Sequence, residues 1–214
     1  MFTVLTTIVV SYPSVTSDVN GFYEFTELEK IGKLCKDKNL AFHIDGARLF
    51  NALVAKKESP LQYGKLFDSI SICLSKGLGA PVGSVLLGNT AFVKKARRWR
   101  KVFGGGMRQA GSLAAAGIYA LDHHVDRLKQ DHEKALLIKA ALVKKDFVTE
   151  VFEVETNIVI AKIEGKYNAT QLSALLKEHH ILVIAMTPAL VRFVLHLDIT
   201  DEMLTTTIAT IEKL

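Results

Sequence analysis

Short apolar segments alternate with helix-forming segments in the first part of this chain, and this alternation constrains the fold more than any other feature. Apolar and β-branched residues predict strands at 1–10, 40–44, 69–74 and 82–87. Helices are predicted over 26–37, 47–55, 91–102 and 109–121, and residues 11–21 have a loop composition. Such alternation is typical of an α/β domain with a mostly parallel sheet. We also expect Thr26 and Glu29 to form a capping box at the first helix.

The pattern changes near residue 125. A charged helix is predicted over 126–144 and a closing helix over 201–214. Short strands and one more helix are expected between them, at 151–152, 158–163, 170–178, 181–184 and 190–195. We therefore predict two domains, an α/β domain over 1–125 and a small α+β domain over 126–214.

Composition restricts the class of protein. Of 214 residues, 49% are hydrophobic and 23% are charged, which is typical of a globular protein that buries a core. The two cysteines, Cys35 and Cys73, exclude a disulfide framework and a cysteine zinc site, and they favour a reducing, cytoplasmic location. The apolar start of the chain is too short for a membrane span, so no membrane partner is expected. The net charge of +5 leaves several partner classes open.

A lysine stands just after the apolar strand predicted at 69–74. Lys76 is followed by Gly77, Gly79 and Gly83, and no acidic residue is near it in sequence. A lysine that attacks a carbonyl needs its neutral amine, and desolvation lowers its pKa toward that form. The glycines leave room for a planar ligand beside the backbone. A surface lysine in a glycine-rich turn fits the same spacing equally well.

A carboxylate ends the strand predicted at 40–44. Asp45 is followed three residues later by Arg48. Ligands of α/β proteins bind at strand ends, where an aspartate can pair with a protonated pyridine nitrogen and an arginine can hold a carboxylate. The simpler alternative is that Asp45 caps the next helix and pairs with Arg48.

Together, an acidic strand end and a lysine-bearing strand end about thirty residues later resemble fold-type I enzymes that use pyridoxal 5'-phosphate (PLP). The match becomes specific in three segments, HIDGARLFNALVA, CLSKGLGAPVGSVLLGN and WRKVFGGGMRQAGSLAAAGIYAL. In their sequences and in their order along the chain, these segments resemble low-specificity L-threonine aldolases, of the family of aromatic amino acid β-eliminating lyases and threonine aldolases. The resemblance runs from about residue 22 to the C-terminus.

The resemblance implies roles for individual residues. Lys76 would be the catalytic lysine that forms the Schiff base with PLP, and Asp45 would bind the pyridine nitrogen. Arg48 would touch the substrate carboxylate or the cofactor ring. Arg192 of the small domain would be a second carboxylate-binding arginine. Three further residues are implied near the site: Lys101 for the substrate, Arg108 for the cofactor and His43 beside Asp45, although a purely structural role suits His43 as well.

The family resemblance also implies an activity. PLP-dependent retro-aldol cleavage would convert L-threonine or L-allo-threonine to glycine and acetaldehyde, as a step of threonine catabolism and glycine biosynthesis. The only partners expected are an amino-acid substrate and other copies of the chain, in a homodimer or homotetramer. Another β-eliminating lyase activity is a less favoured alternative.

Basic residues cluster in Lys94–Lys101, where six of eight residues are cationic. This composition would suit nucleic acid. A solvated helix face with Lys101 directed at the site explains it better, and no nucleic-acid partner is expected. The histidine pairs at 123–124 and 179–180 lack metal-ligand spacing, so no metal is expected either.

Two family features are not recognisable in this sequence. Family members have a glycine-threonine turn for the cofactor phosphate and a histidine that stacks on its ring, both before the matched region. We therefore expect an N-terminally truncated chain. Losing several charge-assisted hydrogen bonds, at roughly 1.5–3 kcal/mol each, would weaken cofactor binding by orders of magnitude. A non-catalytic fragment that keeps the fold is the alternative function.

Overall fold

The computed structural model describes residues 7–11, 14–16, 19–21 and 23–214. The chain divides into two compact units, Met1–Asp126 and Arg127–Leu214. Residues 1–6 of the strand predicted at 1–10 lie outside the described residues. No helix within the described ranges is both long enough and apolar enough to cross a membrane.

The first unit is built on a four-stranded sheet in the order β1-β4-β5-β6. Strand β1 (Thr7–Ser11) pairs in parallel with β4 (Ala41–Gly46), and β4 pairs in parallel with β5 (Ser69–Cys73). Strand β6 (Ser84–Gly88) is antiparallel to β5. The prediction of a mostly parallel sheet is confirmed.

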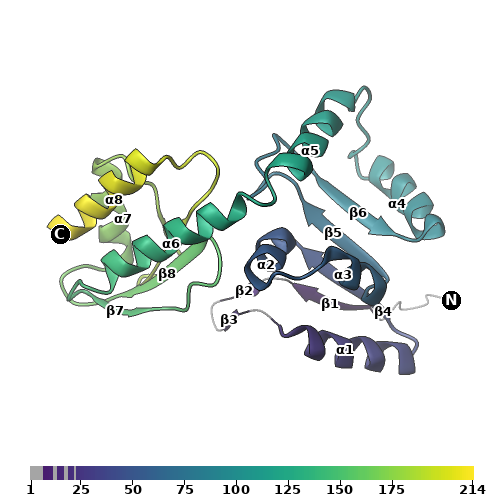
Figure 1. Cartoon of the computed structure of the whole chain (residues 1–214), viewed down its shortest axis with the longest axis horizontal. Helices are drawn as coiled ribbons and strands as arrows, with labels where there is room; N and C mark the ends of the chain where they lie inside the picture. The colour runs from purple at the N-terminus through teal and green to yellow at the C-terminus, as the bar shows by residue number, and fades with distance from the viewer. Residues whose placement is uncertain (1–6, 12–13, 17–18, 22) are drawn as a thin grey trace. The chain divides into compact units, whose positions relative to one another are not determined.

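The helices found among the described residues of this unit, labelled in Figure 1, are α1 (Phe25–Asp37), α2 (Leu49–Lys56), α3 (Pro60–Leu66), α4 (Thr90–Val102) and α5 (Gly111–His123). Helix α3 was not predicted from the sequence, although it begins with a common helix-start signal. Pro60 occupies the first turn, and the side chain of Ser59 accepts a hydrogen bond from the backbone N–H of Leu61.

Two local predictions in the first unit are wrong. The capping box is absent, because α1 has Glu24 at its N-cap with no side-chain cap bond, and Thr26 already lies inside the helix. Residues 11–21 are not only a loop. They include an antiparallel pair, β2 (Ser14–Thr16) and β3 (Val19–Gly21).

The core of the first unit lies on one face of the sheet. Along β4, burial alternates with the period of two expected for a strand, so Phe42 and Ile44 are buried while His43 and Asp45 are not. Leu28 and Cys35 of α1 pack into the same cluster, since they lie seven residues apart on one side of the helix. The opposite face of β4 therefore presents its polar side chains.

The second unit is a small α+β domain. Its sheet has the order β7-β8-β10-β9, and every pairing is antiparallel. The strands are β7 (Val148–Val151), β8 (Ile158–Ile163), β9 (Ile184–Ala185) and β10 (Leu190–Val194), and the helices are α6 (Leu128–Leu142), α7 (Ala169–Glu178) and α8 (Asp201–Lys213). Helix α7 begins with a full capping box between Asn168 and Gln171.

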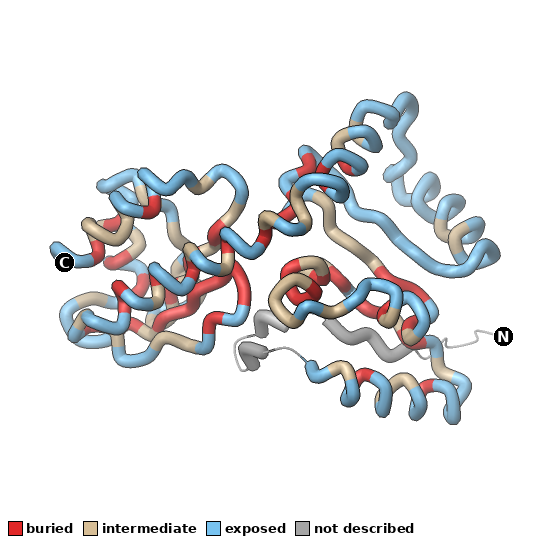
Figure 2. The backbone as a smooth tube through the Cα atoms, viewed as in Figure 1, coloured by how far each residue is buried: buried red, intermediate tan, exposed pale blue. Residues whose placement is uncertain are grey.

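Burial is uneven within the first unit. Figure 2 shows the backbone of α4 and β6 in the colour of exposed residues, whereas parts of β4, α2 and β5 are buried. All five residues of β6 are exposed and α4 has no buried residue. Large apolar side chains such as Trp99 and Phe103, whose rings stack at 5.7 Å, are open to solvent in the chain alone.

Candidate functional site

The carboxyl ends of β1, β4 and β5 meet at one edge of the first sheet, because these strands are parallel. Asp45 is the penultimate residue of β4 and lies level with Ser71 of β5. Strand β5 ends at Cys73, and Lys76 follows three residues later. The fold therefore places the predicted aspartate and lysine at neighbouring strand ends, on the edge where α/β proteins bind ligands.

Polar side chains line one face of β4 and β5 at this edge. The hydroxyl of Ser71 donates a hydrogen bond to Oδ1 of Asp45 over 3.3 Å. Two register positions earlier along the same strands, Nδ1 of His43 lies 2.8 Å from Oγ of Ser69. Asp45 is exposed, so its carboxylate can receive a further donor. Neither serine was predicted as a site residue, because only the strand register shows that they face Asp45 and His43.

The helix-cap alternative for Asp45 is not what the structure shows. Helix α2 has Arg48 at its N-cap, and no side chain caps its first turn. Asp45 instead bonds to the neighbouring strand through Ser71. Arg48 is half-buried at the start of α2, three residues beyond Asp45.

The loop that carries Lys76 has a defined backbone. The N–H of Leu74 donates to the carbonyl of Gly83, and the N–H of Ala80 donates to the carbonyl of Leu74, both at 3.0 Å. Gly79 and Gly83 have φ angles of 69° and 108°, a backbone region that favours glycine. Lys76 itself is exposed. The desolvation invoked for this lysine is therefore not supplied by its immediate neighbours in the chain.

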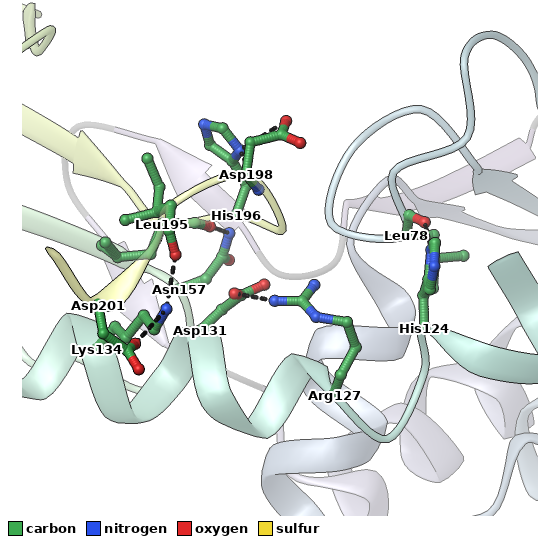
Figure 3. Close-up of polar contacts among 11 residues, drawn as sticks. Leu78, His124, Arg127, Asp131, Lys134, Asn157, Leu195, His196, Asp198 and Asp201 are labelled. Atoms are coloured by element: carbon green, nitrogen blue, oxygen red, sulfur yellow. Dashed lines mark hydrogen bonds and ion pairs between the residues drawn. The ribbon is translucent and has the colours of Figure 1, made fainter. Parts of the chain in front are cut away.

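Helix α5 supports the same loop from one side. Its closing residue, His124, has Nδ1 at 2.6 Å from the carbonyl oxygen of Leu78, as Figure 3 shows. A Cβ added at Gly117 would lie 3.1 Å from Cδ1 of Leu74, so the helix approaches the loop closely. Leu78 is buried. Helix α5 thus contacts the lysine loop at a backbone carbonyl, that of Leu78, and at an apolar side chain, that of Leu74.

Two predicted site residues lie on the exposed part of the first unit. Lys101 is in the last turn of α4, and Arg108 follows the glycine turn after that helix. All six cations of the basic run are exposed, as expected of a solvated helix face. Among the described residues, neither Lys101 nor Arg108 forms a hydrogen bond or ion pair with Asp45 or Lys76.

Arg192 lies in β10 of the second unit, where it pairs with Ile160 of β8 and Ile184 of β9. Its side chain is half-buried, and its buried Nε has no hydrogen-bond partner among the residues that the structure describes. A buried guanidinium nitrogen without an acceptor is costly unless a ligand or water supplies one. Arg192 is therefore equipped to bind an anion such as a carboxylate.

Known proteins with similar sequences include low-specificity L-threonine aldolases. The chain is 44% identical over 177 residues to the low-specificity L-threonine aldolase of Escherichia coli K12, which covers 83% of this chain and 52% of the relative. It is 43% identical over 180 residues to low-specificity L-threonine aldolase 1 of Arabidopsis thaliana, with 83% and 50% covered. The chain thus spans about half the length of the curated relatives it matches.

Solved structures show the same fold. The threonine aldolase of Leishmania major matches 97% of this chain and 60% of its own, with a TM-score of 0.78 at 18% identity. The histidinol-phosphate aminotransferase of Clostridium acetobutylicum matches 97% and 63%, with a TM-score of 0.69 at 15% identity. The chain therefore has the fold of these fold-type I enzymes over their matched parts. The beta-eliminating lyase model matches residues 14–166, which is most of the chain, so the chain belongs to the beta-eliminating lyase family.

Proposed function

We propose that this chain binds PLP at the carboxyl edge of the first sheet and contributes the core of an L-threonine aldolase. The observation that carries the proposal is the placement of Asp45 and Lys76 at neighbouring strand ends on one edge. The site fits a planar ligand, because a polar strand face and a glycine-lined loop flank an exposed amine. When bound, PLP supplies an electron sink for breaking a bond to the α-carbon of an amino acid.

The residues of the first unit have separate roles in this proposal. Lys76 would hold the cofactor covalently through its amine, which must first lose a proton. Asp45 would keep the pyridine nitrogen protonated by pairing with it. Ser71 would orient Asp45 through the hydrogen bond described above. Arg108 would add a cationic contact to the cofactor.

Arginines would select the reaction by orienting the substrate. Arg48 and Arg192 would each bind the substrate carboxylate, with Lys101 contributing positive charge. Fixing the carboxylate fixes which bond to the α-carbon lies perpendicular to the cofactor plane, and that bond is broken. The unsatisfied Nε of Arg192 supports this role.

The proposed reaction is retro-aldol cleavage of L-threonine or L-allo-threonine to glycine and acetaldehyde, which would place the chain in threonine catabolism and glycine formation. The aldolases named above support this substrate class. We also propose a homodimer or homotetramer, because exposed apolar residues of β6 and α4 offer an interface. The free thiols of Cys35 and Cys73 support a cytoplasmic location.

The test is a visible absorbance titration of the purified chain with PLP. We expect a band that saturates with PLP and is absent in Lys76→Ala. Lys65→Ala is the control, because Lys65 is an exposed lysine of α3 away from the loop. Asp45→Asn should weaken binding at least tenfold. No band at saturating PLP would leave the non-catalytic fragment as the function of this chain.

A second assay separates binding from catalysis. Glycine release would be measured from L-threonine and L-allo-threonine with PLP-loaded chain. Release that disappears in Arg192→Lys, with the PLP band retained, would support carboxylate binding by this arginine, because lysine keeps the charge but not the planar pair of donors. A PLP band without glycine release from the unmodified chain would contradict the aldolase assignment.

A further inference from the structure

A cavity of about 720 Å³ lies wholly within the second unit. None of the residues that line it is part of the proposed PLP site. It is open on one side and is lined by the segment before β9, the end of β10 with the segment that follows it, one residue of α6 and one side of α8. Its size falls in the range of cavities that bind small molecules. All the residues that line it lie in the part of the chain that is described in full.

The walls of this cavity are held by hydrogen bonds from outside it. Asn157 receives the N–H of Leu195 on its carbonyl at 2.9 Å and donates its side-chain amide to the carbonyl of Leu195 at 2.7 Å. Lys134 of α6 donates to the carbonyl of Ile199 at 2.6 Å. It also pairs with Asp201 at 2.9 Å, and Figure 3 labels both residues of this pair. The segment after β10 is therefore anchored at both ends before any ligand binds.

Much of the cavity lining is apolar. It includes the buried or half-buried side chains of Ile138, Phe193, Leu195, Ile199 and Leu204. Leu182, which also lines the cavity, is 80% exposed. An apolar ligand body would cover this surface and gain free energy from leaving water.

The polar lining carries acidic but no permanently basic groups. Asp198 and Glu202 contribute carboxylates, and none of the lining residues is lysine or arginine. The side chain of Asp198 is 85% exposed, and its Oδ2 lies 3.4 Å from Nδ1 of His196. Figure 3 labels the two residues. Lys134 is nearby but is not part of the lining, because it is engaged with Ile199 and Asp201. His179, His180 and His196 also line the cavity, so its only permanently charged groups are the two carboxylates, which favour a cation over an anion.

We propose that this cavity binds a small amphipathic molecule with an apolar body and a cationic amine. The apolar body lies against Phe193 and Leu204, and the amine faces Asp198 and Glu202. This inference does not rest on the proposed aldolase activity, since the cavity and the residues that carry the PLP proposal in the first unit do not overlap.

Three probes of equal length and different charge test the proposal: n-octylamine, n-octanol and n-octanoate. Binding to the whole chain is measured by isothermal titration calorimetry and by saturation-transfer NMR. We expect n-octylamine to bind best and n-octanoate worst, with a gap of about tenfold, because two exposed carboxylates each contribute little. Equal binding of the three, tighter binding of n-octanoate, or no binding of any probe overturns the proposal.

Matched variants localise the site. Thr206→Trp places a large ring in the cavity from the exposed side of α8 and should abolish binding of n-octylamine. Thr205→Trp is the control, because Thr205 is equally exposed but does not line the cavity. The double variant Asp198→Asn, Glu202→Gln should reduce binding of n-octylamine to the level of n-octanol and leave n-octanol unchanged. Unchanged amine binding in Thr206→Trp, or loss of binding in Thr205→Trp, would contradict this location.

Discussion

Nδ1 of His124 lies 2.6 Å from the carbonyl oxygen of Leu78, and this contact ties the end of α5 to the loop that carries Lys76. A carbonyl oxygen only accepts hydrogen bonds, so Nδ1 of this histidine must carry the proton. His123, its neighbour, contacts the carbonyl of Tyr119 within the same helix instead. Two adjacent histidines thus differ in whether they support the candidate site.

We expect His124→Ala to loosen the lysine loop, whereas His123→Ala leaves it unchanged. Loss of the bond should lower local stability by about 1 kcal/mol. Hydrogen exchange of the Gly79 and Ala80 amides, which bond to Lys76 and Leu74, reports the effect directly. Equal exchange rates in the two variants would show that His124 does not hold the loop.

Close approach of α5 to the loop predicts a contrast between two glycines of that helix. Gly117→Val forces atoms against Leu74, which lies 3.1 Å from an added Cβ, and should destabilise the chain by about 1–3 kcal/mol. Gly111→Ala meets nothing within 4 Å and should stabilise it slightly, since alanine favours a helix. Urea denaturation of both variants checks the prediction, and a Gly117→Val variant as stable as the wild type would refute it.

Helix α6 carries two ion pairs of the same spacing but opposite burial. Arg127 pairs with Asp131, whose side chain is fully buried, whereas Lys129 and Glu133 are both largely exposed. Asp131→Asn leaves a buried guanidinium uncompensated and should cost about 3 kcal/mol. Glu133→Gln should change stability by less than about 0.5 kcal/mol. Free energies of unfolding from urea titration measure both, and similar values would contradict the role of burial.

His132 makes stability depend on pH. Burial lowers the pKa of this imidazole below its usual value of 6.5, against the opposing effect of Asp131 and Glu133. The unfolded chain therefore binds the proton more readily, and stability should fall as the pH drops below about 6.5 toward the folded-state pKa. His132→Gln should reduce this loss between about pH 7.5 and 5.5. An identical pH dependence of the free energy of unfolding in both proteins would exclude His132 as the cause.

The two cysteines should differ in reactivity. Burial raises the pKa of the Cys35 thiol, with a smaller contribution from Asp68, so little thiolate forms and reagents cannot reach it. Cys73 is half-buried at the end of β5. A thiol reagent should label Cys73 in the native chain and Cys35 only after unfolding, which peptide mass spectrometry distinguishes. If PLP binds as proposed, it should also slow labelling of Cys73.

Local pattern predicted most helices and strands of both units. The ends of α1 and α4 fall within one residue of their expected positions, because helical periodicity and turn residues are encoded within a few positions of each other. Helix α3 was missed because its seven residues are too few to show a period, although Ser59 and Pro60 mark its start. Thr26 and Glu29 have the spacing of a capping box, but the helix begins before Thr26, so no capping box forms there.

The sequence by itself determined the alternation of strands and helices, and it placed Asp45 and Lys76 just after two apolar strands. Only the tertiary structure decided that these strands are parallel neighbours, which brings the two residues to one edge and sets Ser71 against Asp45. The tertiary structure also decided the strand order, the antiparallel direction of β6 and the contact of His124 with Leu78. The physical reason is that strand pairing joins backbone groups far apart in the chain, and register depends on packing of both partners rather than on either strand alone.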